Sequence, residues 1–157
     1  MRVGVTLVRY DGGAFGVGEL WLDPAGVVLA HELPRPGPPA PEDGPELAQR
    51  LAGFFRGEPV AFDDVALDLD GLTPFGQELA AALRAVPRGE VVTYGELAAL
   101  AGRPRAHRAA GSFCARNRFP VFLPCHRVVA AGGIGEYGSS GVAYKRRLLA
   151  LEGRAGL

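Results

Sequence analysis

Apolar and polar residues alternate along the first part of the chain with a period of two. The runs 2–9 and 16–22 are rich in β-branched and aromatic residues, and Asp11-Gly12-Gly13 separates them. A third run, 26–32, follows Asp23-Pro24. Neighbouring side chains of a strand point to opposite faces of a sheet, so this alternation is typical of half-buried strands joined by turns. The pattern predicts an antiparallel meander of three strands.

The next segments predict a loop, a helix and a domain boundary. Residues 34–45 contain six prolines, and proline lacks the N–H group that regular structure needs, so we expect a loop there. Residues 45–55 carry apolar side chains at helical spacing and predict a helix. Residues 60–69 alternate loosely and end at Asp70-Gly71. We therefore expect one domain over 1–72 and a second over 73–157.

The second part of the chain has a mainly helical pattern. Thr73-Pro74 resembles an N-cap followed by proline at the first helical position, and an apolar stripe runs from Phe75 to Val86. Thr93 and Glu96 have the spacing of a capping box that opens a second helix. A third helix is expected from Arg105 to about Ala115. The last two form a helix pair with the spacing of a DNA-binding helix-turn-helix.

Charge is distributed unevenly between these two parts, although the whole chain has a net charge of zero. Residues 1–72 hold 5 Lys and Arg against 12 Asp and Glu, and residues 73–157 hold 12 against 5. Basic side chains neutralise phosphates and release condensed counterions. The second part is therefore the one suited to a polyanion.

Composition excludes some classes of protein. At 48% hydrophobic residues the chain can bury a core, but no stretch approaches the roughly 18 apolar residues of a membrane span, and the start of the chain resembles a strand and not a signal peptide. We expect a cytoplasmic protein without membrane contact. The three histidines and two cysteines show no zinc-like spacing, so no metal and no cofactor are expected. A disulfide framework is not expected either.

The segment from Asn117 to Val129 carries the most specific chemical signal. It is an apolar run, predicted to be a strand, in which Cys125 follows Pro124 and precedes His126 and Arg127. This segment resembles the O6-alkylguanine-DNA alkyltransferase family, whose motif is Pro-Cys-His-Arg-Val. The similarity covers residues 73–157 and includes Thr73-Pro74-Phe75, Gly89 to Tyr94, Asn117, Gly135, Tyr137, Lys145, Leu148-Leu149 and Glu152.

The resemblance implies an α+β fold. A small antiparallel sheet with a helix, RNase H-like, would precede a mainly helical, winged-helix-like domain that contains the helix-turn-helix. It also implies a monomer that acts on double-stranded DNA, flips out an O6-alkylguanine and moves the alkyl group to Cys125 once per molecule. O4-alkylthymine is a second expected substrate.

The nucleophile needs activation, because the thiolate and not the thiol reacts, and a free cysteine is only slightly ionised at neutral pH. His126 is adjacent, but neighbours on a strand point apart, which favours a bridging water between them. The resemblance implies that Glu152 orients His126 and that Tyr94 donates to the departing guanine. From the residues alone, Cys125 could be a buried apolar residue, Glu152 a solvated carboxylate and Tyr94 a packing residue.

Further residues are assigned to DNA or base binding by the resemblance. Arg108 would replace the flipped base, although a phosphate contact is an equally common role for such an arginine. Small residues after it would let the helix approach the minor groove, and Asn117 would tie this helix to the cysteine segment. The full set is Arg108, Ala109, Ala110, Gly111, Asn117, Val128, Tyr137, Gly138, Ser139 and Lys145.

The chain departs from the family pattern in two places, and three other functions stay open. Arg118 stands where proline is common, and the loop around Tyr137 differs in length on both sides. Arg127 is expected in a structural ion pair and Cys114 in packing.

A non-catalytic alkylguanine-binding protein would lack Cys125, while a winged-helix regulator would leave the cysteine motif unexplained. A Cys-His hydrolase would need an oxyanion hole.

Overall fold

The computed structural model describes residues 4–157, which divide into two compact units. The first unit runs to Asp68 and also includes Arg118–Pro120. The second comprises Leu69–Asn117 and Val121–Leu157. The fold mixes helices with a small antiparallel sheet, as the sequence predicted.

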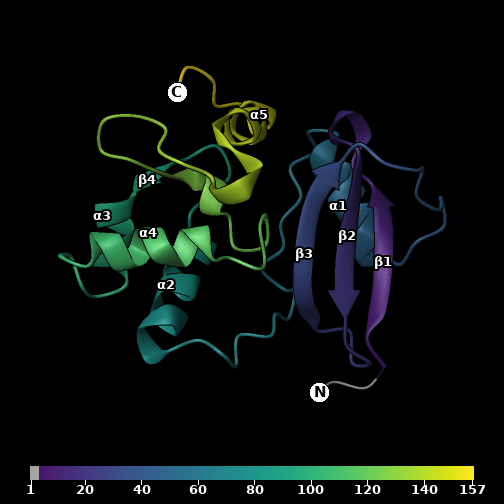
Figure 1. The fold of residues 1–157 in the computed structure, drawn as a ribbon, viewed down its shortest axis with the longest axis horizontal. Helices are drawn as coiled ribbons and strands as arrows, with labels where there is room; N and C mark the ends of the chain where they lie inside the picture. The colour runs from purple at the N-terminus through teal and green to yellow at the C-terminus, as the bar shows by residue number, and fades with distance from the viewer. Residues whose placement is uncertain (1–3) are drawn as a thin grey trace. The chain divides into compact units, whose positions relative to one another are not determined.

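The first unit contains the predicted meander. Strands β1 (Thr6–Asp11), β2 (Val17–Leu22) and β3 (Val28–Arg35) form an antiparallel sheet in the order β1-β2-β3 (Figure 1). A short 3-10 helix, η1 (Gly13–Phe15), connects β1 to β2. The first strand was predicted to begin at residue 2, which lies outside the described residues.

Strand β3 runs further than expected. It includes Pro34 and Arg35, which were predicted to lie in the proline-rich loop. Proline removes one N–H group from a ladder, but β3 lies at the edge of this sheet, where proline is tolerated. Residues 60–69, which alternate loosely in sequence, do not form a strand: only Leu67 pairs with another residue there, through an isolated bridge to Val28.

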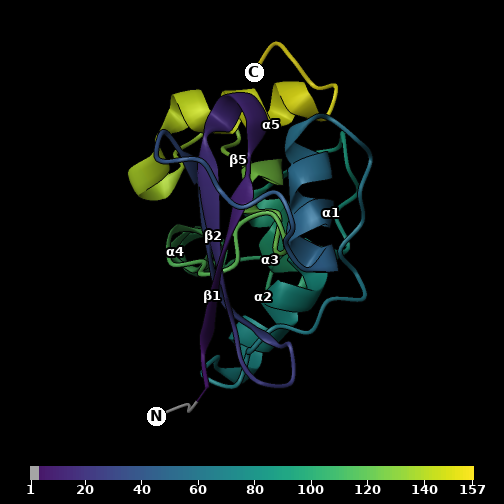
Figure 2. The ribbon, with the colours of Figure 1, turned by 90° about the vertical axis from the view of Figure 1, so that its right-hand side faces the viewer.

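One face of the sheet is covered by α1 (Glu46–Phe55), as Figure 2 shows. Buried apolar residues of the sheet and the helix form the core of the unit. The ring of Tyr10 lies 6.1 Å from that of Phe55, and Phe54 and Leu51 are almost fully buried. The helix spacing read from residues 45–55 therefore marks the face that packs on the strands.

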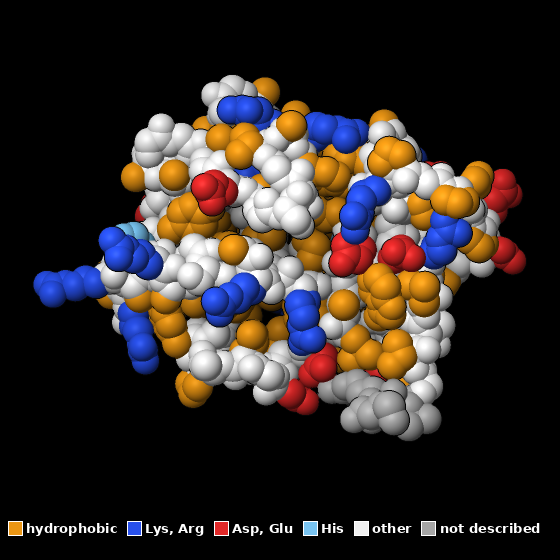
Figure 3. Space-filling view, viewed as in Figure 1, with side chains coloured by type: hydrophobic (Ala, Val, Ile, Leu, Met, Phe, Trp, Pro, Cys, Tyr) orange, Lys and Arg blue, Asp and Glu red, His pale blue; other side chains and the backbone are white. Residues whose placement is uncertain are grey.

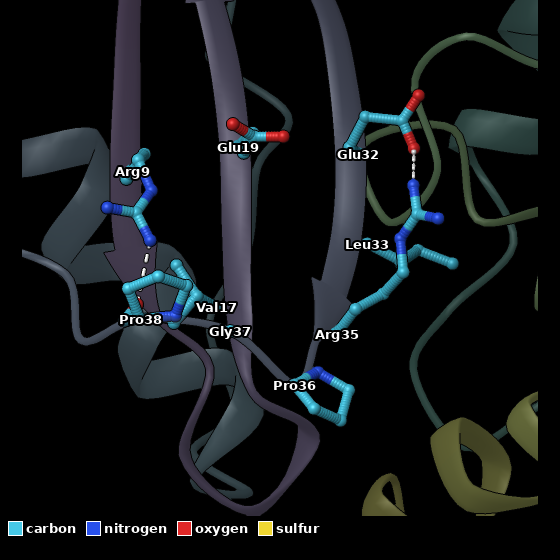
Figure 4. A pocket seen from close by; sticks show the side chains of 9 residues that line it. All are labelled: Arg9, Val17, Glu19, Glu32, Leu33, Arg35, Pro36, Gly37 and Pro38. Carbon is cyan, nitrogen blue, oxygen red and sulfur yellow. Dashed lines mark hydrogen bonds and ion pairs between the residues drawn. The ribbon is translucent and has the colours of Figure 1, made fainter.

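Charged side chains line the other face of the sheet (Figure 4). Arg9, Glu19 and Glu32 occupy paired positions on the three strands. They border a shallow pocket of about 390 Å³ together with Arg35, whose Nη2 lies 3.0 Å from Glu32 Oε2. This solvated face accounts for the polar positions of the alternating pattern.

The second unit is mainly helical, and side-chain caps mark the starts of two of its helices, α2 and α3. Its elements are α2 (Pro74–Arg84), β4 (Val92–Thr93), α3 (Tyr94–Leu100), α4 (His107–Ala115), η2 (Cys125–Arg127), β5 (Val128–Val129), η3 (Gly138–Ser140) and α5 (Val142–Leu151). Thr73 Oγ1 accepts a bond from Gly76 N at 3.0 Å, and the capping box between Thr93 and Glu96 is formed. Both predicted helix starts are confirmed.

Helices α3 and α4 pack together across the turn formed by residues 101–106. Leu97 and Ala98 of α3 and Ala110 of α4 are fully buried. Beside them, β4 and β5 pair in parallel, with Val92 opposite Val128. Among the helices of residues 4–157, none is long and apolar enough to cross a membrane.

Candidate active site

The segment that precedes Cys125 is not the strand predicted from its apolar residues. Residues 118–124 follow an irregular path, and Cys125 begins the 3-10 helix η2. Pro120 and Pro124 cannot donate to a ladder, and Val121 adopts a left-handed backbone with φ of 75°. The apolar pattern instead reflects burial, because Phe119, Val121, Phe122 and Leu123 all lie in the interior.

The Cys125 thiol is buried among hydrogen-bonding groups. The residue is 5% exposed, and its Sγ donates to the Tyr137 hydroxyl oxygen across 3.7 Å. Burial raises the pKa of this thiol, because a thiolate is poorly solvated there, while Asn117, Tyr137 and the Lys145 charge act in the opposite direction. These three groups stabilise the anion that a nucleophilic cysteine must form.

His126, the residue after Cys125, forms a fully buried pair with Glu152. His126 Nε2 lies 3.0 Å from Glu152 Oε1, and both side chains are inaccessible to solvent. A hydrogen on Nε2 that faces the carboxylate leaves the lone pair of a neutral imidazole on Nδ1. Burial lowers the pKa of His126, and Glu152 opposes that shift. The ring can therefore act as a neutral base oriented by a carboxylate.

Arg127 forms the structural ion pair predicted for it. Its Nε donates to Glu152 Oε1 at 2.9 Å, its Nη2 to Oε2 at 2.5 Å, and its Nη1 to the Val86 carbonyl at 2.7 Å. Burial alone would raise the pKa of Glu152, but the bonds from His126 and Arg127 outweigh it and lower the pKa to about 2. Glu152 therefore stays ionised at neutral pH.

Lys145 occupies a position that the sequence did not indicate. It was expected among the DNA- and base-binding residues, yet its side chain is fully buried and its Nζ donates to the Glu136 carbonyl at 2.9 Å. The same nitrogen lies 5.8 Å from the ring centre of Tyr94 and 6.0 Å from that of Tyr137. Burial lowers its pKa, and Cys125 opposes that shift.

Tyr94 is the first residue of α3 and is half-buried. Its hydroxyl donates to the Glu136 carbonyl at 3.5 Å. Burial first, and then nearby acidic groups including Cys114 and Cys125, raise its pKa to about 12. The phenol therefore keeps its proton at neutral pH, as a hydrogen-bond donor must.

The loop after β5 contains three of the residues expected to bind the base, and only Tyr137 of these lies in the interior. Tyr137 is buried, whereas Gly138 and Ser139 are exposed in η3. Val128 is fully buried in β5. Tyr137 is hydrogen-bonded to the Cys125 thiol.

Helix α4 presents a basic surface. Arg108 and Ala109 are exposed and Gly111 is half-buried. Ala110 is fully buried and lies on the side of α4 that faces the core; its assignment to DNA binding stays a prediction. Arginine side chains gather over α4 and the loop before it (Figure 3).

Asn117 links the end of α4 to the cysteine segment. Its Nδ2 donates to the Leu123 carbonyl at 2.8 Å, the kind of bond that the sequence predicted for it. Sequence reasoning missed the Val86 and Glu136 carbonyls, which accept from Arg127 and Lys145. Main-chain groups carry no side-chain signal that could have identified them.

Metal ligands do not gather within residues 4–157. No group of three or more His, Cys, Asp or Glu side chains there could hold an ion. Both cysteines are free thiols.

Comparison with known proteins assigns the chain to a family. Residues 74–154 match the model of the DNA-binding domain of 6-O-methylguanine DNA methyltransferase. The methylated-DNA–protein-cysteine methyltransferase of Methanopyrus kandleri is 42% identical over 80% of this chain and 95% of its own length. The human protein of that name is 36% identical over 88% of this chain and 71% of its own length.

Solved structures agree with this assignment. The O6-methylguanine methyltransferase of Mycobacterium tuberculosis is 33% identical, with a TM-score of 0.78 over 97% of this chain and 95% of that one. The same bacterium's protein in complex with DNA is 34% identical, with a TM-score of 0.74 over 96% and 93%. The chain therefore belongs to the O6-methylguanine-DNA methyltransferase family.

Proposed function

We propose that this chain repairs DNA by moving an alkyl group from the O6 of guanine to Cys125. Relatives that match most of its length are named methylated-DNA–protein-cysteine methyltransferases. The observation that carries the proposal is the environment of the buried Cys125 thiol. The thiol is hydrogen-bonded to the Tyr137 hydroxyl, and the next residue, His126, pairs with Glu152. Hydrogen-bond partners and a nearby cation lower the pKa of a thiol and so favour the nucleophilic thiolate.

The proposed reaction begins when Cys125 loses its proton to His126, directly or through a water, while Glu152 stabilises the imidazolium. The thiolate attacks the alkyl carbon, a carbon–sulfur bond forms, and the bond from that carbon to O6 breaks with its electrons left on guanine. Tyr94 donates to a ring nitrogen of the departing base. The product is a thioether, which water does not cleave, so each molecule acts once.

In this proposal, main-chain groups of η2, β5 and the loop after β5 recognise the guanine base. The main-chain carbonyls of Cys125 and Val128 would accept from the guanine edge. The amides after Tyr137, at Gly138 and Ser139, would donate to it. Burial of the Tyr137 side chain beside an exposed 3-10 turn supports this arrangement. O4-alkylthymine is a second proposed substrate.

Binding of double-stranded DNA is proposed for α4. A base in a duplex is unreachable, so the nucleotide must be flipped out at a cost of a few kcal/mol. Exposed Arg108 would fill the vacated space, and Ala109 and Gly111 would allow close approach to the minor groove. The exposed basic surface over this helix supports the proposal.

The finer fold assignment is also proposed. We take residues 1–72 as an RNase H-like domain and 73–157 as a winged-helix-like domain in which α3 and α4 form a helix-turn-helix. The change of compact unit between Asp68 and Leu69 and the short turn between α3 and α4 support it. We further propose that the protein acts as a monomer without metal.

Mass spectrometry tests the reaction. Incubation with duplex DNA that contains O6-methylguanine is expected to add one methylene to the peptide that holds Cys125. Cys125→Ala should abolish the addition, and the matched control Cys114→Ala should keep it. An unmodified Cys125 peptide after complete incubation would overturn the proposal.

A further inference from the structure

A short segment before Cys125, Arg118–Pro120, belongs to the first compact unit, whereas the residues on both sides of it belong to the second. The chain passes from Asn117 into the segment Arg118–Pro120, which belongs to the first unit, and returns at Val121. One residue of strand β3, His31, is hydrogen-bonded to two carbonyls of this segment. The main-chain N–H of His31 donates to the Arg118 carbonyl at 2.9 Å, and its Nδ1 lies 2.6 Å from the Pro120 carbonyl.

The partners of His31 define which of its nitrogens carries the proton. A carbonyl can only accept, so Nδ1 must donate to Pro120. The other nitrogen, Nε2, is then an acceptor, and the Tyr10 hydroxyl donates to it at 2.5 Å. Burial lowers the pKa of His31 to about 4, which agrees with this neutral form. Tyr10 thus holds His31 in the tautomer that binds Pro120.

A glycine on the neighbouring strand leaves room for the Tyr10 ring. Tyr10 lies opposite Gly18 on β2, and a Cβ atom on Gly18 would lie 2.1 Å from the Tyr10 ring. Only glycine leaves room for the ring at this position. The ring also stacks on His31 with 5.7 Å between centroids. Tyr10 is 2% exposed and His31 3%, so both are fixed by packing.

The turn that follows is strained and held at both ends. Val121 has a φ of 75°, which is a genuine outlier for a β-branched residue and persists only where surrounding contacts impose it. His31 fixes the Pro120 carbonyl on one side. On the other, Asn117 fixes the Leu123 carbonyl at 2.8 Å, and the Cys125 N–H donates to the same carbonyl at 2.7 Å.

We infer that His31 and Tyr10 are positioning residues for Cys125. They hold the Pro120 carbonyl and so maintain the strained turn that sets the place of the Leu123 carbonyl and the Cys125 backbone. Neither residue touches the reacting atoms. The inference rests on the proposed function of Cys125, and the link to it is the main chain from Pro120 to Cys125.

The test measures the single-turnover rate of alkyl transfer from free O6-benzylguanine, which needs no DNA contact. His31→Leu removes the donor to Pro120 and is expected to slow transfer between about tenfold and about a hundredfold, since small misplacements of a reacting group have effects of this size. His31→Asn keeps a donor at the position of Nδ1 and should recover most of the rate.

Two further variants separate positioning from stability. Tyr10→Phe removes one hydroxyl and should slow transfer about two- to tenfold, which corresponds to one neutral hydrogen bond; it serves as the test if His31→Leu does not fold. Leu51→Ala truncates a fully buried residue of α1 in the same unit. It should lower the melting temperature without slowing transfer in the folded protein.

The outcomes distinguish this inference from the proposed function. If the natural chain transfers no alkyl group to Cys125, the proposed function itself is wrong. If it does, but folded His31→Leu and Tyr10→Phe react at the natural rate, the inference is overturned. The inference also fails if His31→Asn is as slow as His31→Leu, or if Leu51→Ala slows transfer equally.

Discussion

Replacement of Glu152 by glutamine tests the electrostatics of the buried site. The Glu152 carboxylate is inaccessible to solvent and accepts two bonds from Arg127, while His126 Nε2 lies 3.0 Å from it. Glutamine keeps the size of the side chain and removes the charge. It also places an NH₂ group opposite the N–H donors of either His126 or Arg127, where two donors cannot bond to each other. Glu152→Gln therefore leaves the Arg127 charge, which is 11% exposed, without its counterion.

The magnitude follows from the pKa of Glu152, which is lowered from 4.5 to about 2. Each pKa unit corresponds to 1.36 kcal/mol, so ionised Glu152 stabilises the fold by about 3 kcal/mol. Because the folded-state pKa is depressed, this stability is fully present above pH 4.5 and is lost as the pH falls toward 2. Removal of one partner of a buried pair costs about 3–5 kcal/mol.

Urea unfolding at several pH values measures the effect. At pH 7 Glu152→Gln should lower the free energy of unfolding by about 3 kcal/mol or more. The difference from the natural chain should shrink by about 2 kcal/mol between pH 5 and pH 3. Glu58→Gln is the matched control, because the Glu58 side chain is 54% exposed and pairs with Arg56 at the surface; it should change stability by less than about 1 kcal/mol. A difference for Glu152→Gln that stays constant across pH would refute the reasoning.

Three further substitutions give separate tests. Thr93→Ala removes the capping box of α3 and should lower the free energy of unfolding by about 1 kcal/mol; an unchanged urea midpoint would contradict this. Arg108→Ala should slow repair of duplex DNA far more than reaction with free O6-benzylguanine, and equal losses on both substrates would argue against a role in base replacement. Tyr137→Phe removes a hydroxyl that lowers the pKa of Cys125. The rate of alkylation rises with pH as the thiolate forms, so this variant should shift the pH–rate profile to higher pH, and an unshifted profile would show that the hydroxyl does not act on the thiol.

Helices and strands that depend on nearby residues, through caps, turns and alternating faces, could be predicted from the sequence. Thr73 and Thr93 cap their helices through bonds to residues three positions later, and such spacings are visible in the sequence. The meander was also visible, since its turns and its alternating faces are local features. The ion pair of Arg127 was expected, although its carbonyl partner at Val86 was not.

Contacts between distant segments could not be predicted in this way. Residues 118–124 are apolar enough for a strand, but Val121 and two prolines give them an irregular path. The family resemblance assigned Lys145 to DNA and base binding, and only the fold shows that its side chain is buried and that its Nζ donates to the Glu136 carbonyl. The bond from His31 to Pro120 joins residues 89 positions apart. No periodicity or spacing encodes such a pair.

Stoichiometric labelling tests most directly whether Cys125 is the acceptor of a reaction that occurs once. The protein is incubated with an excess of duplex DNA whose O6-methylguanine carries a labelled methyl group, and the label on protein, DNA and solvent is followed to completion. We predict that label on the protein stops at one methyl group per chain, all of it on Cys125. Label that passes to water, that exceeds one per chain or that lies on another residue would contradict the account.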